Sequence, residues 1–485
     1  MESLRSKTLR GVGWSSIENI ATTGITFLVG LILARLLSPQ EFGTIGIIMV
    51  FIAVGNTFIE VGFNAAIIRK IDVRECDFNT TFYVGLVIAV LLYIFLWILA
   101  PAIENFFEES GIYWQIRVTA LMLPLGAMSV VQRAVLTREI NFKVQTKVIL
   151  ISAIASGAIG VSMAFMGFGV WSLVAQILSR TALQTLFFWI YCKWRPKFEF
   201  SRESFNELFA FSSKLLGASM IETLYRNVYS VIIGKIYSVE LLGQYNRAMS
   251  FSNIFSINIS NVVQRVSFPV LSAIQNEPER LKQAYRKVIK MTMLVTFMLM
   301  LGLAAVAKPA VIVMIGEKWI PAVYLLQILC LSEMFYPLHA INLNILNVVG
   351  RSDLFLRLEI YKKIIALPTI LIGIFWGLDM MLWSSVLVSL VSYILNVYYS
   401  ASLIGYSVKE QLNDILPMFL ISGAVGLVMW GITWLDMPYL TMLFVQVAVG
   451  ASIAIILFEK FGSEEYCEIK MLFLAFIKKR INERR

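Results

Sequence analysis

Residues 78–100 read FNTTFYVGLVIAVLLYIFLWILA and contain no charged side chain. An uninterrupted apolar segment of this length is typical of a helix that crosses a lipid bilayer. Similar segments follow along the 485 residues, so that the chain is 58% hydrophobic and 15% charged, with a mean hydropathy of +0.76. Soluble domains contain about 25% charged residues. The sequence therefore predicts an all-α, multi-pass membrane protein.

Apolar segments of spanning length occur about fourteen times along the chain. About six lie between residues 12 and 192, about six more between 208 and 404, and two between 415 and 458. The predicted parts are an N-terminal six-helix lobe at 1–200, a C-terminal six-helix lobe at 201–405, two additional transmembrane helices at 406–460 and a basic tail at 461–485.

Lysine and arginine gather in alternate loops, for example at 69–74, 193–202 and 280–290. The positive-inside rule places such loops in the cytoplasm, so both termini are expected there as well. The net charge of +10 is thus spread over many loops and does not form one patch. This distribution excludes nucleic acid as a partner.

An internal repeat at an interval of roughly 200 residues relates the two predicted lobes. In the loop after the first helix of each lobe, Arg35, Leu36, Ser38 and Gly43 recur as Lys235, Ile236, Ser238 and Gly243. Transporters built from repeats of one topology bind their substrate between the repeats. Because that path lies within a single chain, we expect a monomer.

Polar residues inside the predicted spans indicate a cavity, because a charge at the bilayer centre costs about 3 kcal/mol on insertion scales. The cationic candidates for substrate binding are Arg226, Arg247 and Arg265. The polar candidates for cavity lining are Asn56, Asn64, Asn258 and Asn261. The acidic candidates for a coupling ion are Glu18, Glu60 and Glu222. Polar residues also join helices to one another in lipid, so helix packing remains the alternative role for these candidates. The spacing of Glu222 and Arg226 suits an ion pair within one helix.

Several chemistries lack their sequence signature. The four cysteines are scattered, so neither a metal site nor a disulfide framework is expected. There is no phosphate-binding loop and no hydrolase motif in a usable context, so the chain is not expected to be an enzyme or to use a cofactor. Transport would run downhill or use a gradient of H+ or Na+. The single histidine, His339, is interpreted as a packing residue in preference to a proton relay.

Two segments resemble a known family: Leu9–Ser15, LRGVGWS, and Ala34–Gly43, ARLLSPQEFG. They are similar to Wzx-like polysaccharide transporters, nearest the colanic acid exporters, of the multidrug/oligosaccharidyl-lipid/polysaccharide flippase superfamily. The resemblance covers nearly the whole chain. It implies a protein of the bacterial inner membrane that moves undecaprenyl-diphosphate-linked oligosaccharide from the cytoplasmic to the outer leaflet by alternating access. Membrane lipids, a polysaccharide polymerase and export machinery are the implied partners.

The cation candidates suit a diphosphate, and the asparagines suit a sugar chain. A multidrug antiporter of the same superfamily is the alternative, but it would prefer an acidic, aromatic cavity. A membrane-embedded polymerase or glycosyltransferase would need a sizeable loop or domain with acid/base or metal-binding residues. The predicted loops outside the membrane are short, which disfavours this second alternative.

Overall fold

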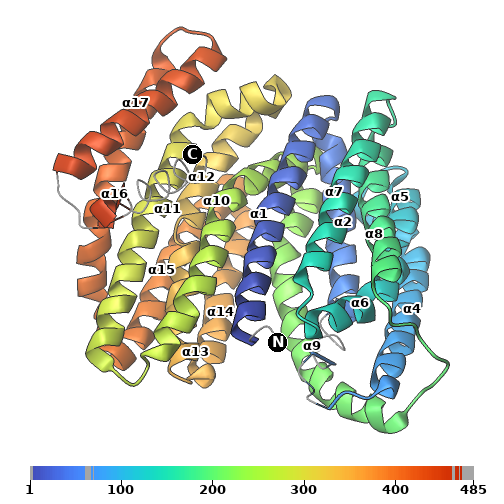
Figure 1. Ribbon diagram of the computed structural model, residues 1–485. Helices are drawn as coiled ribbons and strands as arrows, with labels where there is room; N and C mark the ends of the chain where they lie inside the picture. The colour runs from blue at the N-terminus through green and yellow to red at the C-terminus, as the bar shows by residue number, and fades with distance from the viewer. Residues whose placement is uncertain are drawn as a thin grey trace, which may run out of the picture. The chain divides into compact units, whose positions relative to one another are not determined.

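The computed structural model describes residues 4–60, 67–68, 70, 72–460, 465–468 and 470–471. Within these ranges the chain forms helices joined by short connections, and no strand occurs (Figure 1). The prediction of an all-α fold is confirmed. Eleven segments of the described chain are long and apolar enough to cross a membrane.

The helices follow the same order twice. The first set comprises α1 (Leu4–Leu36), α2 (Pro39–Glu60), α4 (Glu75–Phe107), α5 (Ile112–Thr119), α6 (Met122–Arg138), α7 (Phe142–Phe165) and α8 (Val170–Tyr191). The second comprises α9 (Arg202–Ile232) with the π-helical turn η1 (Ile233–Tyr237), α10 (Val239–Ala273), α11 (Pro278–Ile315) with the 3₁₀ turn η2 (Glu317–Trp319), α12 (Pro321–Glu333), α13 (Tyr336–Val348), α14 (Ser352–Trp376) and α15 (Leu378–Ile404). The final pair is α16 (Val408–Gly431), extended by η3 (Ile432–Trp434), and α17 (Tyr439–Lys460).

The fourth predicted span of each set is interrupted. Expected as one helix, it forms α5 and α6 in the first set and α12 and α13 in the second. Pro124 lies in the first turn of α6, and Pro337 lies in the first turn of α13. Proline has no N–H and clashes with the carbonyl four residues earlier, so it ends the preceding helix and suits the start of the next. The interruption is thus a second structural sign of the repeat.

Three of the fourteen predicted spans, α9, α10 and α14, are not among the eleven apolar segments. They contain 31, 35 and 25 residues, each longer than the roughly 20 residues that cross a bilayer. Charged side chains contribute to this result: α14, for example, carries Glu359, Lys362 and Lys363 close together. The count of fourteen spans therefore stays a prediction, while the helices themselves exist where the sequence predicts them.

The chain divides into two compact units, Met1–Asn246 and Arg247–Arg485, which we call unit 1 and unit 2. In unit 1, α1 packs against α7, α7 against α8, and α9 against α2 and α4. In unit 2, α11 packs against α16, and α14 against α15. The first helix of the second set therefore lies in unit 1. The predicted boundary between the two six-helix lobes, near residue 200, was based on the internal repeat. It stays a prediction.

Candidate functional site

The N-terminal turns of α2 and α10 cross at two glycines, Gly43 and Gly243. A methyl group on Gly43 would lie 1.7 Å from the carbonyl oxygen of Val239, and one on Gly243 would lie 1.8 Å from the carbonyl oxygen of Pro39. Because Pro39 and Gly43 correspond to Val239 and Gly243 in the repeat, the contact is reciprocal. Normal carbon–oxygen contacts are about 3.3 Å, so only glycine fits at either position. We call these four residues the paired-glycine contact.

Ion pairs and hydrogen bonds surround this contact within unit 1. Lys235 Nζ lies 2.8 Å from Glu108 Oε1, and Gln40 Nε2 donates to Glu109 Oε1 at 3.0 Å. The hydrogen bond from Lys235 lowers the pKa of the Glu108 carboxyl below its usual value. The end of α4 is thereby joined to the start of α2 and to η1. The positive-inside rule predicts that this end of unit 1 is external.

Farther along α9, polar side chains meet α2 and one another. The hydroxyls of Thr57 on α2 and Thr223 on α9 lie 2.8 Å apart. Arg226 Nε donates to Glu222 Oε1 at 2.7 Å, so the predicted ion pair within this helix is confirmed. The Arg226 side chain is 63% exposed. Asn56, one residue before Thr57, is half-buried.

The acidic candidates have different surroundings. The Glu18 carboxylate on α1 accepts a hydrogen bond from Thr146 Oγ1 on α7 at 3.2 Å. Glu222 is the partner of Arg226, as described above. The side chain of Glu60 and the whole of Asn64 lie outside the described residues.

Four candidates lie on the part of α10 that belongs to unit 2. Arg247, Asn258 and Asn261 are half-buried, and Arg265 is exposed. Asn258 Nδ2 donates to the carbonyl oxygen of Ile254 at 2.7 Å, which ties this amide to its own helix. Arg247 and Arg265 are separated by five full helical turns, so they share a face but lie about 27 Å apart along the axis. One diphosphate is too small to contact both.

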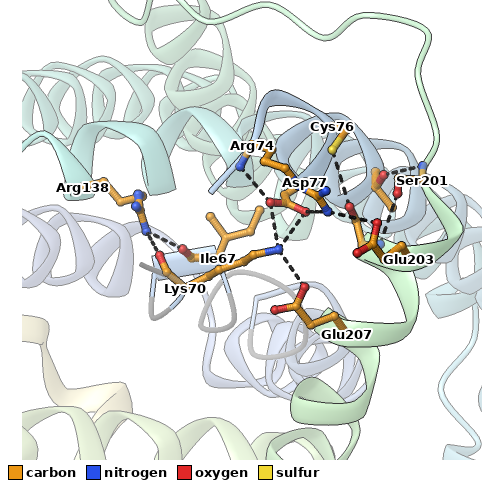
Figure 2. Close-up of polar contacts among 11 residues, drawn as sticks. Ile67, Lys70, Arg74, Cys76, Asp77, Arg138, Ser201, Glu203 and Glu207 are labelled. Carbon is orange, nitrogen blue, oxygen red and sulfur yellow. Dashed lines mark hydrogen bonds and ion pairs between the residues drawn. The ribbon is translucent and has the colours of Figure 1, made fainter. Parts of the chain in front are cut away.

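A further polar cluster, at the opposite end of unit 1, was not predicted from the sequence. It comprises Lys70, Arg74, Asp77 and Glu207, here called the Asp77 network (Figure 2). The buried Asp77 carboxylate accepts hydrogen bonds from the Arg74 backbone N–H at 2.8 Å and from Lys70 Nζ at 3.1 Å. Lys70 Nζ also donates to Glu207 on α9 at 2.8 Å. Burial lowers the pKa of Lys70, but these hydrogen bonds raise it more, so the net pKa lies above its usual value.

Additional bonds hold the surrounding backbone at this end of unit 1. Arg138 Nη1, from the last turn of α6, donates to the carbonyl oxygens of Ile67 and Lys70 at 2.8 and 2.5 Å (Figure 2). Asn79 on α4 accepts from the backbone N–H of Lys197 at 3.0 Å and donates to Glu199 at 3.1 Å. The start of α9 and the segment before it are therefore anchored to α4. The only sequence feature that pointed to the Asp77 network was Asp77 itself, an aspartate in the first turn of a helix that follows a basic loop.

The core of unit 2 contains a buried polar group centred on Asn342. Tyr285 Oη donates to Asn342 Oδ1, and Asn342 Nδ2 donates to Gln411 Oε1 at 3.4 Å. Near it, His339 lies 3.2 Å from Ser389 Oγ and 3.1 Å from Asn396 Nδ2. Because the Asn396 amide donates to Nδ1, the Nε2–H of a neutral ring donates to Ser389. Both ring nitrogens of His339 are therefore hydrogen-bonded within unit 2, as the interpretation of a packing residue expects.

Comparison with known proteins identifies the family. The sequence matches the family model described as "Polysaccharide biosynthesis protein" over residues 32–324, which is more than half of the chain. The chain belongs to this polysaccharide biosynthesis protein family.

Two curated proteins are similar to this chain over most of their length. The teichuronic acid biosynthesis protein TuaB of Bacillus subtilis (strain 168) is 25% identical over 459 residues, covering 93% of this chain and 95% of TuaB. The lipopolysaccharide biosynthesis protein WzxC of Escherichia coli (strain K12) is 24% identical over 445 residues, covering 88% and 89% of the two chains. The predicted resemblance to Wzx-like proteins is confirmed.

A solved structure has a fold similar to that of this chain. The lipid II flippase MurJ, in an inward closed conformation, superposes with a TM-score of 0.74 at 14% identity, over 92% of this chain and all of MurJ. The flippase-type membrane fold is thus confirmed at a sequence identity too low to carry over individual residues.

Proposed function

We propose that this polysaccharide biosynthesis protein is a lipid-linked oligosaccharide flippase of the bacterial inner membrane. Its substrate would be undecaprenyl-diphosphate-linked repeat units, moved from the cytoplasmic to the outer leaflet by alternating access. The observation that carries this function is the family match over residues 32–324, extended to nearly the full chain by TuaB and WzxC. The MurJ-like fold supports it independently.

The chemistry of α9 suits such a substrate. A diphosphate binds best to arginine, whose planar guanidinium donates two parallel hydrogen bonds. Arg226 lies in the interior of α9 and is exposed, with Glu222 as its ion-pair partner. Because Arg247 and Arg265 lie about 27 Å apart along α10, they would contact the diphosphate at different stages of its passage. The asparagines Asn56, Asn258 and Asn261 would offer neutral hydrogen bonds to the sugars.

The ion pair on α9 also suggests how a gradient would be coupled to export. A diphosphate that binds Arg226 competes with Glu222 for the same guanidinium. The ion pair and the substrate complex would therefore be alternate states of the transport cycle, and Glu222 would be a candidate carboxylate for H+ or Na+ in one of them. Glu18 and Glu60 remain further candidates for the coupling ion. Membrane lipids, a polymerase and export machinery are proposed partners of a protein that acts as a monomer and has no catalytic step.

The test is rescue of polysaccharide export in cells that lack their own flippase, at matched membrane abundance. We expect wild type to restore export and Arg226→Ala to abolish it, with partial rescue by Arg226→Lys, which keeps the charge but loses the bidentate geometry. Arg280→Ala is the matched control, because Arg280 is an exposed arginine that also pairs with a glutamate, Glu277. Full rescue by Arg226→Ala would contradict the assigned cation site.

A further inference from the structure

A groove of about 850 Å³ opens in unit 2 where α14 begins, α15 ends and α16 begins. Its lining includes Arg351, Leu354, Tyr398, Ser402, Leu403 and Lys409. All of these lie at the helix ends that the positive-inside rule places at the cytoplasmic surface. Basic pockets between membrane helices on that side are typical binding sites of anionic lipid headgroups.

The charge of the groove suits a single phosphodiester. Arg351 Nε and Nη2 each lie 2.9 Å from an oxygen of Asp353, so one carboxylate holds the guanidinium in place and balances its charge. Lys409 is exposed, and no ion pair to it occurs among the described residues. The mouth of the groove therefore has about one uncompensated positive charge. A phosphodiester carries one negative charge, whereas a diphosphate carries more.

Two apolar stripes run from the groove into the membrane. On α15 the exposed side chains Leu387, Val391, Ile394 and Tyr398 are spaced by four, three and four residues, and on α16 Leu412, Leu416 and Leu420 follow Lys409 at similar spacing. Residues at these intervals share one helix face. Their exposure on membrane-spanning helices is explained by contact with acyl chains. Tyr398 belongs both to its stripe and to the groove lining.

We propose that this groove binds one anionic glycerophospholipid of the cytoplasmic leaflet. Its phosphodiester would lie between Arg351 and Lys409, and its acyl chains along the exposed faces of α15 and α16. The basic residues at the end of the chain, among them Lys478, Lys479 and Arg480, make the C-terminal segment an unsuitable occupant, because it has the same charge as the groove. This binding site is separate from the proposed flippase substrate and does not depend on it.

The test uses the purified full-length protein in neutral detergent, with bound lipid measured by native mass spectrometry. The probes are phosphatidylglycerol and phosphatidylcholine with identical acyl chains. We expect one phosphatidylglycerol to be retained by wild type, and a roughly thirtyfold weaker affinity in Arg351→Gln/Lys409→Gln, since two cations near a lipid surface are lost. Phosphatidylcholine should bind weakly to both proteins. The matched control is Arg280→Gln/Lys287→Gln, which removes two exposed cations of α11.

The single variant Lys409→Gln disturbs no described ion pair, so it separates loss of binding from loss of fold, and a several-fold weaker affinity is expected. Equal retention of phosphatidylglycerol by the groove variants and the control would overturn the proposal. Displacement of the lipid by millimolar pyrophosphate would also overturn it, because the site would then prefer a diphosphate or a soluble anion. Because no oligosaccharide enters this experiment, its failure would leave the flippase function unaffected.

Discussion

Replacing Gly43 by alanine should force apart the starts of α2 and α10. The new methyl carbon would lie 1.7 Å from the carbonyl oxygen of Val239, about 1.6 Å closer than a normal carbon–oxygen contact. The obstacle is backbone, which cannot turn aside as a side chain can. Overpacking of this kind costs about 1–3 kcal/mol, and we expect the upper part of that range. Gly243→Ala should behave alike, because its methyl group would meet the Pro39 carbonyl at 1.8 Å.

The double variant Gly43→Ala/Gly243→Ala tests the reciprocal contact more strictly than either single variant. Once either alanine has separated the helices, the second methyl group finds part of the room it needs, so the two costs should not add. Thermal unfolding of the purified protein measures each cost. Gly24→Ala in α1 is the control, because nothing lies within 4 Å of its new methyl group, and alanine is favoured over glycine in a helix by about 1 kcal/mol.

An accessibility assay follows the same separation in cells. Ile47 lies within α2 and is fully buried. Labelling of Ile47→Cys by a membrane-impermeant maleimide added outside should therefore increase when Gly43→Ala is introduced. A Gly43→Ala protein that melts at or above the wild-type temperature, or a double variant whose loss equals the sum of the single losses, would refute the close backbone contact.

Two further outcomes follow from the buried polar groups. Lys70→Met should destabilise unit 1 by about 3 kcal/mol, because the buried Asp77 carboxylate loses its ammonium partner. The Lys70 pKa is raised above 10.5, so while the Asp77 carboxylate is ionised the pair stabilises the fold fully below pH 10.5 and loses its effect as the pH rises through the raised pKa. The melting-temperature difference between wild type and variant should thus be constant from pH 6 to 9. Asn342→Ala should cost about 1–3 kcal/mol, since Tyr285 and Gln411 lose their buried partner, and a melting curve equal to wild type would contradict that network.

Hydropathy alone predicts most of the helices, because a bilayer-spanning helix satisfies its own backbone and needs only apolar side chains. It does not locate the break between α12 and α13, since apolar residues continue across it. There the deciding residue is Pro337, whose missing N–H acts locally. The Glu222–Arg226 pair was predictable for the same reason, because its geometry depends on one helix.

Contacts between distant segments were not predictable. Thr57 and Thr223 are 166 residues apart, and Lys70 and Glu207 are 137 apart, so their meeting depends on which helices pack together. Hydropathy contains no information about that choice. The predicted common face of Arg247 and Arg265 agrees with their spacing, but their grouping as one cation site overlooked the rise of the helix. Roles for the candidate residues in substrate or ion binding stay predictions.

The paired-glycine contact has a consequence for the ancestry of the chain. Gly43 meets the Val239 carbonyl, and Gly243 meets the Pro39 carbonyl, as in the interface of a two-fold symmetric homodimer, where the same patch serves both partners. A half-length ancestor with one copy of this segment would have touched a second copy of itself in the same way. Gene duplication and fusion of such an ancestor would give the present chain, with most positions of the two halves then free to diverge. A side chain at either glycine would obstruct the other half, so neither position could change alone.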